Sequence, residues 1–369
     1  MKKSDSGKPD FILLIIVAVL LLLGIIVLAS VSTALSQAKF NSTAVFLSHY
    51  IFWGLIPALV LGFIAFKIPL ALWRKWALPL LLINLFLMVL VFLPKIGITS
   101  SGASRWLDLG FTSLQPSEFL KLSSIIYFAA WLSARGEKIK EKKFSATFAA
   151  FAVMIGLIGL LFFFQSNIST LGIIAVTATL MYFLAGTPLK HSFFIVSAGI
   201  TALFILIKIA PYRFDRFLVF LKPDIDPMGI SYQIKQALIA VGSGGIFGKG
   251  FGLSAQKFGQ LPESMTDAIF AIFSEEAGFI GSFILVTLFV LFAWRGFKIA
   301  KNIQNKFLQL TCFGIVIWLT LQAFVNIGAM IGLLPLTGIP LPFISYGGSA
   351  LVSELIGVGI LLNISKTHD

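Results

Sequence analysis

The sequence contains little charge and almost no cysteine. Charged residues make up 12% of its 369 residues, and Cys312 is the one cysteine. A single cysteine excludes an intramolecular disulfide, and together with only three scattered histidines it argues against a protein metal site. So low a charge content excludes an ordinary soluble domain. The net charge is +13, but no basic soluble surface remains that would bind nucleic acid.

Long apolar runs fill most of the chain. A membrane-spanning helix needs about 20 apolar residues, and the alternation expected of a membrane strand is missing. We therefore expect an all-α polytopic membrane protein that forms a single transmembrane domain over residues 1–369. The expected transmembrane helices, about ten by this length criterion, are 11–33, 46–66, 76–94, 117–134, 144–164, 168–186, 191–210, 267–293, 307–333 and 343–364.

The lysines and arginines predict the orientation of these spans. With a cytoplasmic N-terminus, seventeen of them fall in inner segments and ten in outer segments, as the positive-inside rule requires. Six of the ten outer ones lie in one long polar stretch, 211–266, between the seventh and eighth spans. We therefore expect both termini in the cytoplasm and one large extracellular loop at 211–266. The basic residues of that loop would suit an anionic ligand at the outer face.

Polar residues precede the fourth expected span. Arg105 and Gln115 lie in the loop before it, and Glu118 and Lys121 lie in its first turn. Because residues three apart share one helix face, Glu118 and Lys121 can pair. One interpretation is a structural ion pair that lets both charges enter the membrane. The other is the polar floor of an outward-facing cavity, which the nearby Arg105 and Gln115 favour.

Acidic residues mark the start of the eighth span. Asp267 is placed where a carboxylate can cap a helix and interact favourably with its dipole. Thr266 can cap equally well, which would leave Asp267 free for chemistry. Glu275 and Glu276 lie deeper in the apolar run, so they must be protonated, paired or directed into a polar cavity.

The long outer loop has two features of its own. Residues 231–241 are apolar at helical spacing and predict a short helix in the membrane interface. The following stretch, 242–250, is rich in glycine, which predicts tight turns and close backbone approach. Its backbone amides and Lys249 could bind a phosphate; simple flexibility is the alternative.

An irregular segment precedes the tenth span. Residues 336–349 contain two prolines and three glycines, which preclude a regular helix. Irregular backbone survives in a membrane only when it is buried in protein or lines a cavity. We therefore expect this segment, with Ser345, to fold back toward the protein, and we expect Glu354 in the span below to need a partner. All these polar segments fall on the predicted outer side, which predicts a single site there.

Three segments, 102–119, 261–281 and 336–349, resemble signature segments of the SEDS family (shape, elongation, division and sporulation). The resemblance covers nearly the whole chain. It implies a peptidoglycan glycosyltransferase that polymerises lipid II into glycan strands at the outer face of the bacterial cytoplasmic membrane, in cell division or elongation. Residues 254–258 are more similar to the division branch, FtsW, and 336–343 are equally similar to the elongation branch, RodA; the prediction leans to FtsW.

The resemblance implies an inverting glycosyl transfer with Asp267 as the catalytic carboxylate. The carboxylate would act as general base on the acceptor hydroxyl while undecaprenyl pyrophosphate leaves. Cationic side chains would stabilise that anionic leaving group. No protein metal site is expected, but a divalent cation, Mg²⁺ or Mn²⁺, on the pyrophosphate is compatible with this chemistry. The substrate-binding candidates are Arg105, Glu118, Lys121, Arg213, Lys249, Gln115 and Ser345.

The resemblance also implies partners. These are lipid II and the undecaprenyl-pyrophosphate-linked glycan, a class B penicillin-binding protein, other membrane proteins of the divisome or elongasome, and membrane lipids. Two alternatives stay open: a transporter that flips the lipid-linked precursor, which the buried carboxylates would suit, and a non-catalytic division scaffold. The chain departs from the family pattern at 165–170, where a Pro and an Asp are absent, and at Met265, where a His is common.

Overall fold

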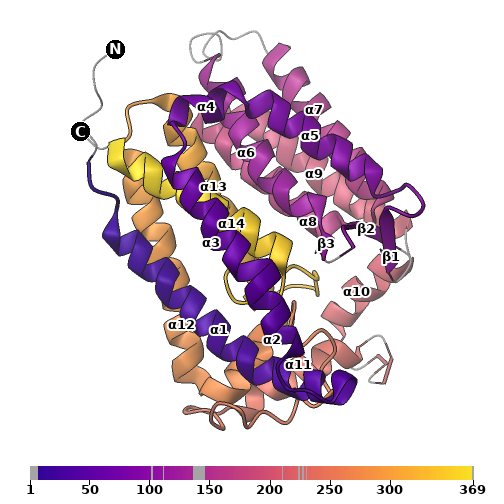
Figure 1. Ribbon diagram of the computed structural model, residues 1–369. Coiled ribbons are helices and arrows are strands. Elements are labelled where there is room, and N and C mark those ends of the chain that lie inside the picture. The colour runs from indigo at the N-terminus through magenta and orange to yellow at the C-terminus, as the bar shows by residue number, and fades with distance from the viewer. Residues whose placement is uncertain are drawn as a thin grey trace.

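The protein is a bundle of helices with one small antiparallel sheet (Figure 1). The computed structural model describes residues 7–100, 103–110, 112–135, 146–209, 211–222, 225–226, 228–229 and 231–367. The strands are β1 (Gly97–Ser100), β2 (Ala103–Asp108) and β3 (Ser113–Leu114). The helices are α1 (Phe11–Phe40), α2 (Val45–Tyr50), the π-helix η1 (Ile51–Leu55), α3 (Ile56–Lys67), α4 (Leu70–Lys75), α5 (Ala77–Leu90), α6 (Pro116–Ser133), α7 (Ala146–Phe164), α8 (Ile168–Leu184), α9 (Leu189–Ile209), α10 (Pro211–Leu221), α11 (Tyr232–Ser243), α12 (Ile269–Lys301), α13 (Lys306–Met330), α14 (Gly348–Ile364) and the 3-10 helix η2 (Ser365–Thr367).

The helices agree with a polytopic membrane protein. Within the described residues, six helices are long and apolar enough to cross a membrane: α1, the continuous α2–η1–α3, α7, α12, α13 and α14. Shorter apolar helices occur in α5, α8 and α9. Every predicted span therefore overlaps a helix, and the predicted helical membrane architecture is confirmed, whereas the number of ten spans stays a prediction.

The two ends of the bundle differ. Both termini lie at one end, and the small sheet, α10 and α11 lie at the other (Figure 1). Near the termini, the Asp10 backbone amide donates to Ser365 Oγ at 2.9 Å, and Arg295 Nη2 lies 2.7 Å from Asp10 Oδ2. The termini thus share one side, as the charge pattern predicts. Which side faces the cytoplasm stays a prediction, and the basic residues of 1–6 and 136–145 that contribute to it lie outside the described residues.

The small sheet corrects the expectation of a purely α-helical chain. Its strands pair in the order β1-β2-β3, with Gly97 opposite Leu107 and Leu107 opposite Leu114. Backbone groups near a membrane need hydrogen-bond partners, and this connection supplies them by pairing with itself. The sheet holds Arg105 in β2, one of the predicted site residues.

The described part of the long loop contains two helices where one was predicted. Helix α11 confirms the prediction for 231–241, and its buried residues Ile234, Ala237 and Ala240 recur every three positions along one face. Helix α10 was missed, because charged residues interrupt its apolar pattern. Helix α11 packs against α12 and helix α10 against α9, both at the end of the bundle opposite the termini.

The centre of the bundle is formed by α13 and α14, which are buried on most of their faces. Helix α3 packs closely on α14, since a Cβ at Gly359 would lie 2.1 Å from the Gly62 carbonyl oxygen. Polar side chains on α13 and α14 are therefore enclosed by protein. They lie beneath the end of the bundle that carries the predicted site.

Candidate active site

The irregular segment 336–349 is bound directly to the segment that ends at Asp267. Ser345 Oγ donates to the Thr266 carbonyl at 2.6 Å, and the Tyr346 amide donates to the Met265 carbonyl at 2.8 Å. The predicted return of this segment toward the site is therefore confirmed. Ser345 is used in holding the backbone beside Asp267, and its predicted contact with substrate stays a prediction.

Asn326 of α13 fixes the backbone of Asp267 itself. Its Nδ2 donates to the carbonyls of Asp267 at 2.7 Å and Ile339 at 2.8 Å, and the side chain is buried. One amide thus joins α13 to the irregular segment and to the loop that ends at Asp267. A buried amide that satisfies two carbonyls is costly to remove, so Asn326 is a positioning residue of this site.

Asp267 does not cap the helix that follows it. Helix α12 begins at Ile269, its N-cap residue is Ala268, and no side chain caps it. Thr266 Oγ1 donates instead to the Glu263 side chain at 2.7 Å. The capping interpretation is therefore wrong for both candidates, and Asp267 lies in the loop just before the helix.

The Asp267 carboxylate is buried and incompletely bonded. Its residue is 8% exposed, and Oδ1 has no hydrogen-bond partner among the residues that the structure describes. Gln233 lies beside it, but the Gln233 amide nitrogen does not reach hydrogen-bonding geometry. Burial first, and then the charge of Glu263, raise the pKa of Asp267 to about 6, while the charge of Arg216 opposes the rise. A carboxylate with a free lone pair and a pKa near neutrality has the properties of a general base.

Glu118 and Lys121 form the predicted ion pair. Lys121 Nζ lies 2.8 Å from Glu118 Oε2, and both side chains are almost fully buried. Lys121 also donates to Gln322 Oε1 at 2.7 Å and lies over the Trp318 ring. The backbone amide of Gln115, just before α6, donates to Ser349 Oγ at the start of α14, at 3.0 Å. The predicted ion pair is therefore present, and direct substrate contacts of these residues stay predictions.

Gln322 connects that ion pair to the irregular segment. Its Nε2 donates to the Pro340 carbonyl at 3.0 Å and to Glu354 Oε1 at 3.3 Å. The other oxygen of Glu354 accepts from the Phe343 amide at 2.9 Å. The partner that Glu354 was expected to need is therefore present. Gln322 of α13 and Glu354 of α14 thus hold the irregular segment 336–349 beside Asp267.

Arg105 is attached to the turn between α7 and α8. Its Nε donates to the Gln165 carbonyl at 3.1 Å and its Nη2 to the Ser166 carbonyl at 2.6 Å. This turn lies in residues 165–170, where the chain departs from the family pattern. In the structure its carbonyl groups hold the Arg105 side chain. A substrate contact of Arg105 stays a prediction.

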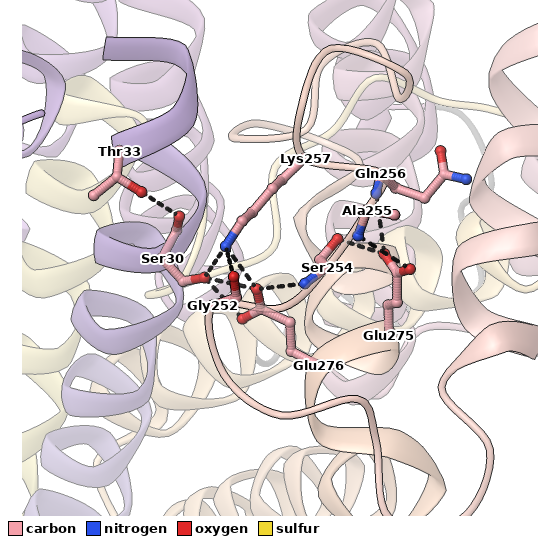
Figure 2. A network of polar contacts seen from close by, with 9 residues as sticks. All are labelled: Ser30, Thr33, Gly252, Ser254, Ala255, Gln256, Lys257, Glu275 and Glu276. Carbon is pink, nitrogen blue, oxygen red and sulfur yellow. Dashed lines mark hydrogen bonds and ion pairs between the residues drawn. The ribbon is translucent and has the colours of Figure 1, made fainter. Parts of the chain in front are cut away.

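Glu275 and Glu276 are paired, as their depth in α12 requires. Lys249 Nζ lies 2.6 Å from Glu275 Oε1, and Ser254 Oγ donates to the same carboxylate. Lys257 Nζ lies 3.3 Å from Glu276 Oε1. Figure 2 shows Lys257 directed at Glu276 and at Ser30 of α1, so that the loop, α12 and α1 meet at one polar cluster.

The glycine-rich stretch packs on a kink in α12. Gly278 has non-helical backbone angles, with φ 67° and ψ −166°. The amides of Lys249 and Gly250 donate to the carbonyls of Glu275 and Glu276, each at 3.0 Å. A Cβ at Gly248 would lie 2.1 Å from the Glu276 carbonyl oxygen, so close approach explains this glycine. These two amides are occupied, and phosphate binding by Lys249 stays a prediction.

The sequence pointed to Arg213, but the structure draws attention to Arg216. Arg213 lies in α10, and its side chain is outside the described residues. Arg216, one turn later, is exposed, donates from Nη1 to the Leu336 carbonyl at 3.4 Å and acts electrostatically on Asp267. Sequence reasoning also missed Gln322 and Asn326, although polar side chains inside an apolar span are a signal of function.

The comparisons with known proteins agree with this geometry. Residues 11–369 match the model of the FtsW, RodA and SpoVE family, described as cell cycle protein. Stage V sporulation protein E of Bacillus subtilis is 38% identical over 366 residues, 98% of each chain. A probable peptidoglycan glycosyltransferase FtsW of a Geobacter species is 37% identical over 359 residues, 96% of each chain.

Solved structures give the same result. The rod shape determining protein RodA of Thermus thermophilus matches with a TM-score of 0.72 at 25% identity, over 98% of this chain and 97% of that one. A chain of a peptidoglycan synthase complex matches with a TM-score of 0.76 at 26% identity, over 97% of each. The relatives come from both branches, so the preference for the division branch stays a prediction. The chain belongs to the FtsW, RodA and SpoVE family of multi-pass membrane proteins, the SEDS family that its sequence resembles.

Proposed function

We propose that the protein is a peptidoglycan glycosyltransferase, which polymerises lipid II into glycan strands at the outer face of the cytoplasmic membrane in cell division or elongation. The names of the FtsW relatives support the activity. One observation carries the assignment to a site: the Asp267 carboxylate is buried and has an oxygen without a hydrogen-bond partner among the described residues. Asn326 holds the backbone of Asp267, and the charge of Arg216 acts on its carboxylate.

The proposed reaction is a single displacement with inversion. The hydroxyl oxygen of the acceptor sugar forms a bond to the anomeric carbon of the donor, and the bond from that carbon to the pyrophosphate breaks. Asp267 takes the hydroxyl proton, which is effective because its raised pKa is close to the working pH. The pyrophosphate departs as an anion with its polyprenyl chain.

Cations near the leaving group would lower the barrier by stabilising the charge that develops on it. Arg216 is the cation whose charge acts on Asp267 in this structure. The sequence candidates Arg105, Lys121, Arg213 and Lys249 stay predictions. The described residues contain no cluster of three or more metal-ligating side chains, so a divalent cation would take most of its ligands from the pyrophosphate and water.

The proposal includes a partner. One solved relative belongs to a complex that coordinates polymerization and crosslinking. This supports a class B penicillin-binding protein as the crosslinking partner of this chain, alongside other membrane proteins of the divisome or elongasome.

The transporter alternative rested on the buried carboxylates Glu275, Glu276 and Glu354. In the structure each of them is engaged by a lysine or an amide, which weakens the support that they give to that alternative. A scaffold without activity would not require the unpartnered carboxylate at Asp267.

The test is a polymerisation assay with purified protein in detergent, with lipid II and with or without the cognate transpeptidase. Flipping needs two compartments, so glycan chains formed in detergent can come only from polymerisation. Asp267→Asn and Asp267→Ala should abolish chain formation while the protein stays folded. The control is Asp108→Asn, which changes an exposed carboxylate that accepts a hydrogen bond from the nearby Gly110 amide. Full activity of Asp267→Asn would remove Asp267 as the base.

A further inference from the structure

A cavity of about 150 Å³ lies between α10, α11 and the residues after α13. Its walls include Val219 and Phe220 of α10, Ile234 and Leu238 of α11, and Leu334. Within the described lining the one charged residue is Arg216. Leu336, another wall residue, begins the segment that returns to Asp267. The cavity is therefore apolar, has a cation at one wall and adjoins the proposed active site.

The surroundings of the cavity are apolar as well. Phe214, Phe217 and Leu221 of α10 are exposed, and so is Leu333 beside the cavity. An amphipathic helix with exposed aromatic and aliphatic side chains at the end of a membrane bundle is suited to the lipid interface. An apolar chain could thus enter the cavity from the bilayer without crossing water.

Arg216 determines what kind of ligand fits. The guanidinium has five N–H donors and binds phosphate oxygens through paired hydrogen bonds. Among the described residues, Arg216 Nη1 donates to the Leu336 carbonyl, which leaves further guanidinium donors for a ligand. The matching ligand has an anionic phosphate head and an apolar chain.

We propose that this cavity binds the donor substrate at the junction of its diphosphate and isoprenoid chain, with the diphosphate at Arg216. This inference rests on the proposed function. A cavity of about this size holds one small hydrocarbon such as benzene, so it fits the first isoprenoid unit, and the rest of the chain lies in the bilayer.

The reaction itself assigns the site to the donor. The bond that breaks joins the anomeric carbon to the donor's diphosphate, so that diphosphate must lie close to the base. The acceptor reacts through a sugar hydroxyl, and its own diphosphate is a disaccharide away from the reacting atoms. A diphosphate site electrostatically coupled to Asp267 therefore belongs to the donor.

The test is photocrosslinking of Asp267→Asn protein in detergent with a benzophenone-bearing isoprenoid diphosphate. Because no turnover is needed, the result is independent of whether Asp267 is the base. We expect crosslinks on α10, α11 or 331–336 that excess isoprenoid diphosphate suppresses and excess phospholipid does not. Suppression by phospholipid, or crosslinks confined to other helices, would overturn the inference.

Two pairs of variants sharpen this test. Leu238→Trp fills the cavity, whereas Ile239→Trp changes the exposed neighbour on the same helix. Arg216→Gln removes the cation at the wall, whereas Lys222→Gln removes an exposed cation just beyond α10. We expect the first member of each pair to weaken isoprenoid diphosphate binding about tenfold or more, and the second to leave it unchanged. Thermal unfolding of all four verifies folding, and equal binding within either pair contradicts the inference.

Discussion

At the scale of single residues, Asp267 gives the protein a pH dependence that can be predicted. A general base must be ionised, and burial raises the pKa of Asp267 to about 6. The rate constant kcat/KM should therefore fall as the pH drops through about 6, instead of near 4 as for an ordinary aspartate. Glu263→Gln removes one cause of the raised pKa, so the fall in kcat/KM should move to lower pH. Arg216→Gln removes a charge that lowers the pKa, so this acidic limb of the pH profile should move to higher pH. A limb that neither substitution moves would contradict the assignment.

Asn326 supports a second prediction at this scale. Asn326→Ala leaves the carbonyls of Asp267 and Ile339 without their common donor in a buried place. An unsatisfied buried carbonyl costs about 1–3 kcal/mol, so we expect a lower Tm and a large loss of kcat. Asn363→Ala is a matched control, since its Nδ2 donates to the Ile68 carbonyl near the C-terminal end of the bundle. It should lower Tm without a selective loss of kcat; equal losses of kcat in both would argue against a positioning role.

The sequence singled out Asp267, the proposed base, but not the residues that hold it. Asp267 follows a polar loop, and its segment resembles a known signature, so it could be found. Asn326 and Gln322 lie inside an apolar run, and nothing in that run indicates which loop they contact. Their roles depend on long-range packing, with Asn326 reaching a carbonyl 59 residues away.

At the scale of elements, the polar cluster between the long loop, α12 and α1 predicts a difference between two lysines. The Lys257 side chain is 4% exposed and faces a fully buried Glu276, whereas that of Lys249 is 39% exposed (Figure 2). Removing one partner of a buried pair costs about 3–5 kcal/mol. Lys257→Met should therefore lower the free energy of unfolding by more than Lys249→Met, because the Lys249 side chain is partly exposed and that of Lys257 is not. Both carboxylates keep other hydrogen bonds, Glu275 from the Ser254 hydroxyl and Glu276 from the Ser30 hydroxyl.

Thermal unfolding in one detergent would measure this difference. In the double variant Lys257→Met, Glu276→Gln, the buried charge is gone, so part of the lost stability should return. Equal losses for the two lysine variants would mean that the loop does not depend on the Lys257–Glu276 pair.

The elements that the sequence did not predict are those whose pattern is short or mixed. The strands β1–β3 are short and lie in a loop between two strongly apolar runs. Helix α10 has Arg213, Asp215 and Arg216 between its apolar residues, so its sequence pattern resembles that of a polar loop. The long apolar helices, by contrast, were predictable because hydrocarbon allows a spanning segment few alternatives.

At the scale of the whole molecule, the proposed function requires that the end carrying Asp267 faces outward. The excess of lysine and arginine in the predicted inner segments supports that orientation. Both termini lie at the opposite end from the sheet, α10 and α11 (Figure 1). If the orientation were reversed, the site would meet cytoplasmic precursors and could not elongate an external polymer.

Single introduced cysteines can test the orientation, because the native Cys312 is fully buried and should not react. Met228→Cys lies in the long loop at a residue that is 86% exposed, and Gln304→Cys lies at an exposed position between α12 and α13. In right-side-out vesicles a membrane-impermeant maleimide should label residue 228 and spare 304, and inverted vesicles should give the reverse. Labelling of 304 alone in right-side-out vesicles would place Asp267 on the cytoplasmic side and exclude polymerisation at the outer face, whatever the activity of the purified protein.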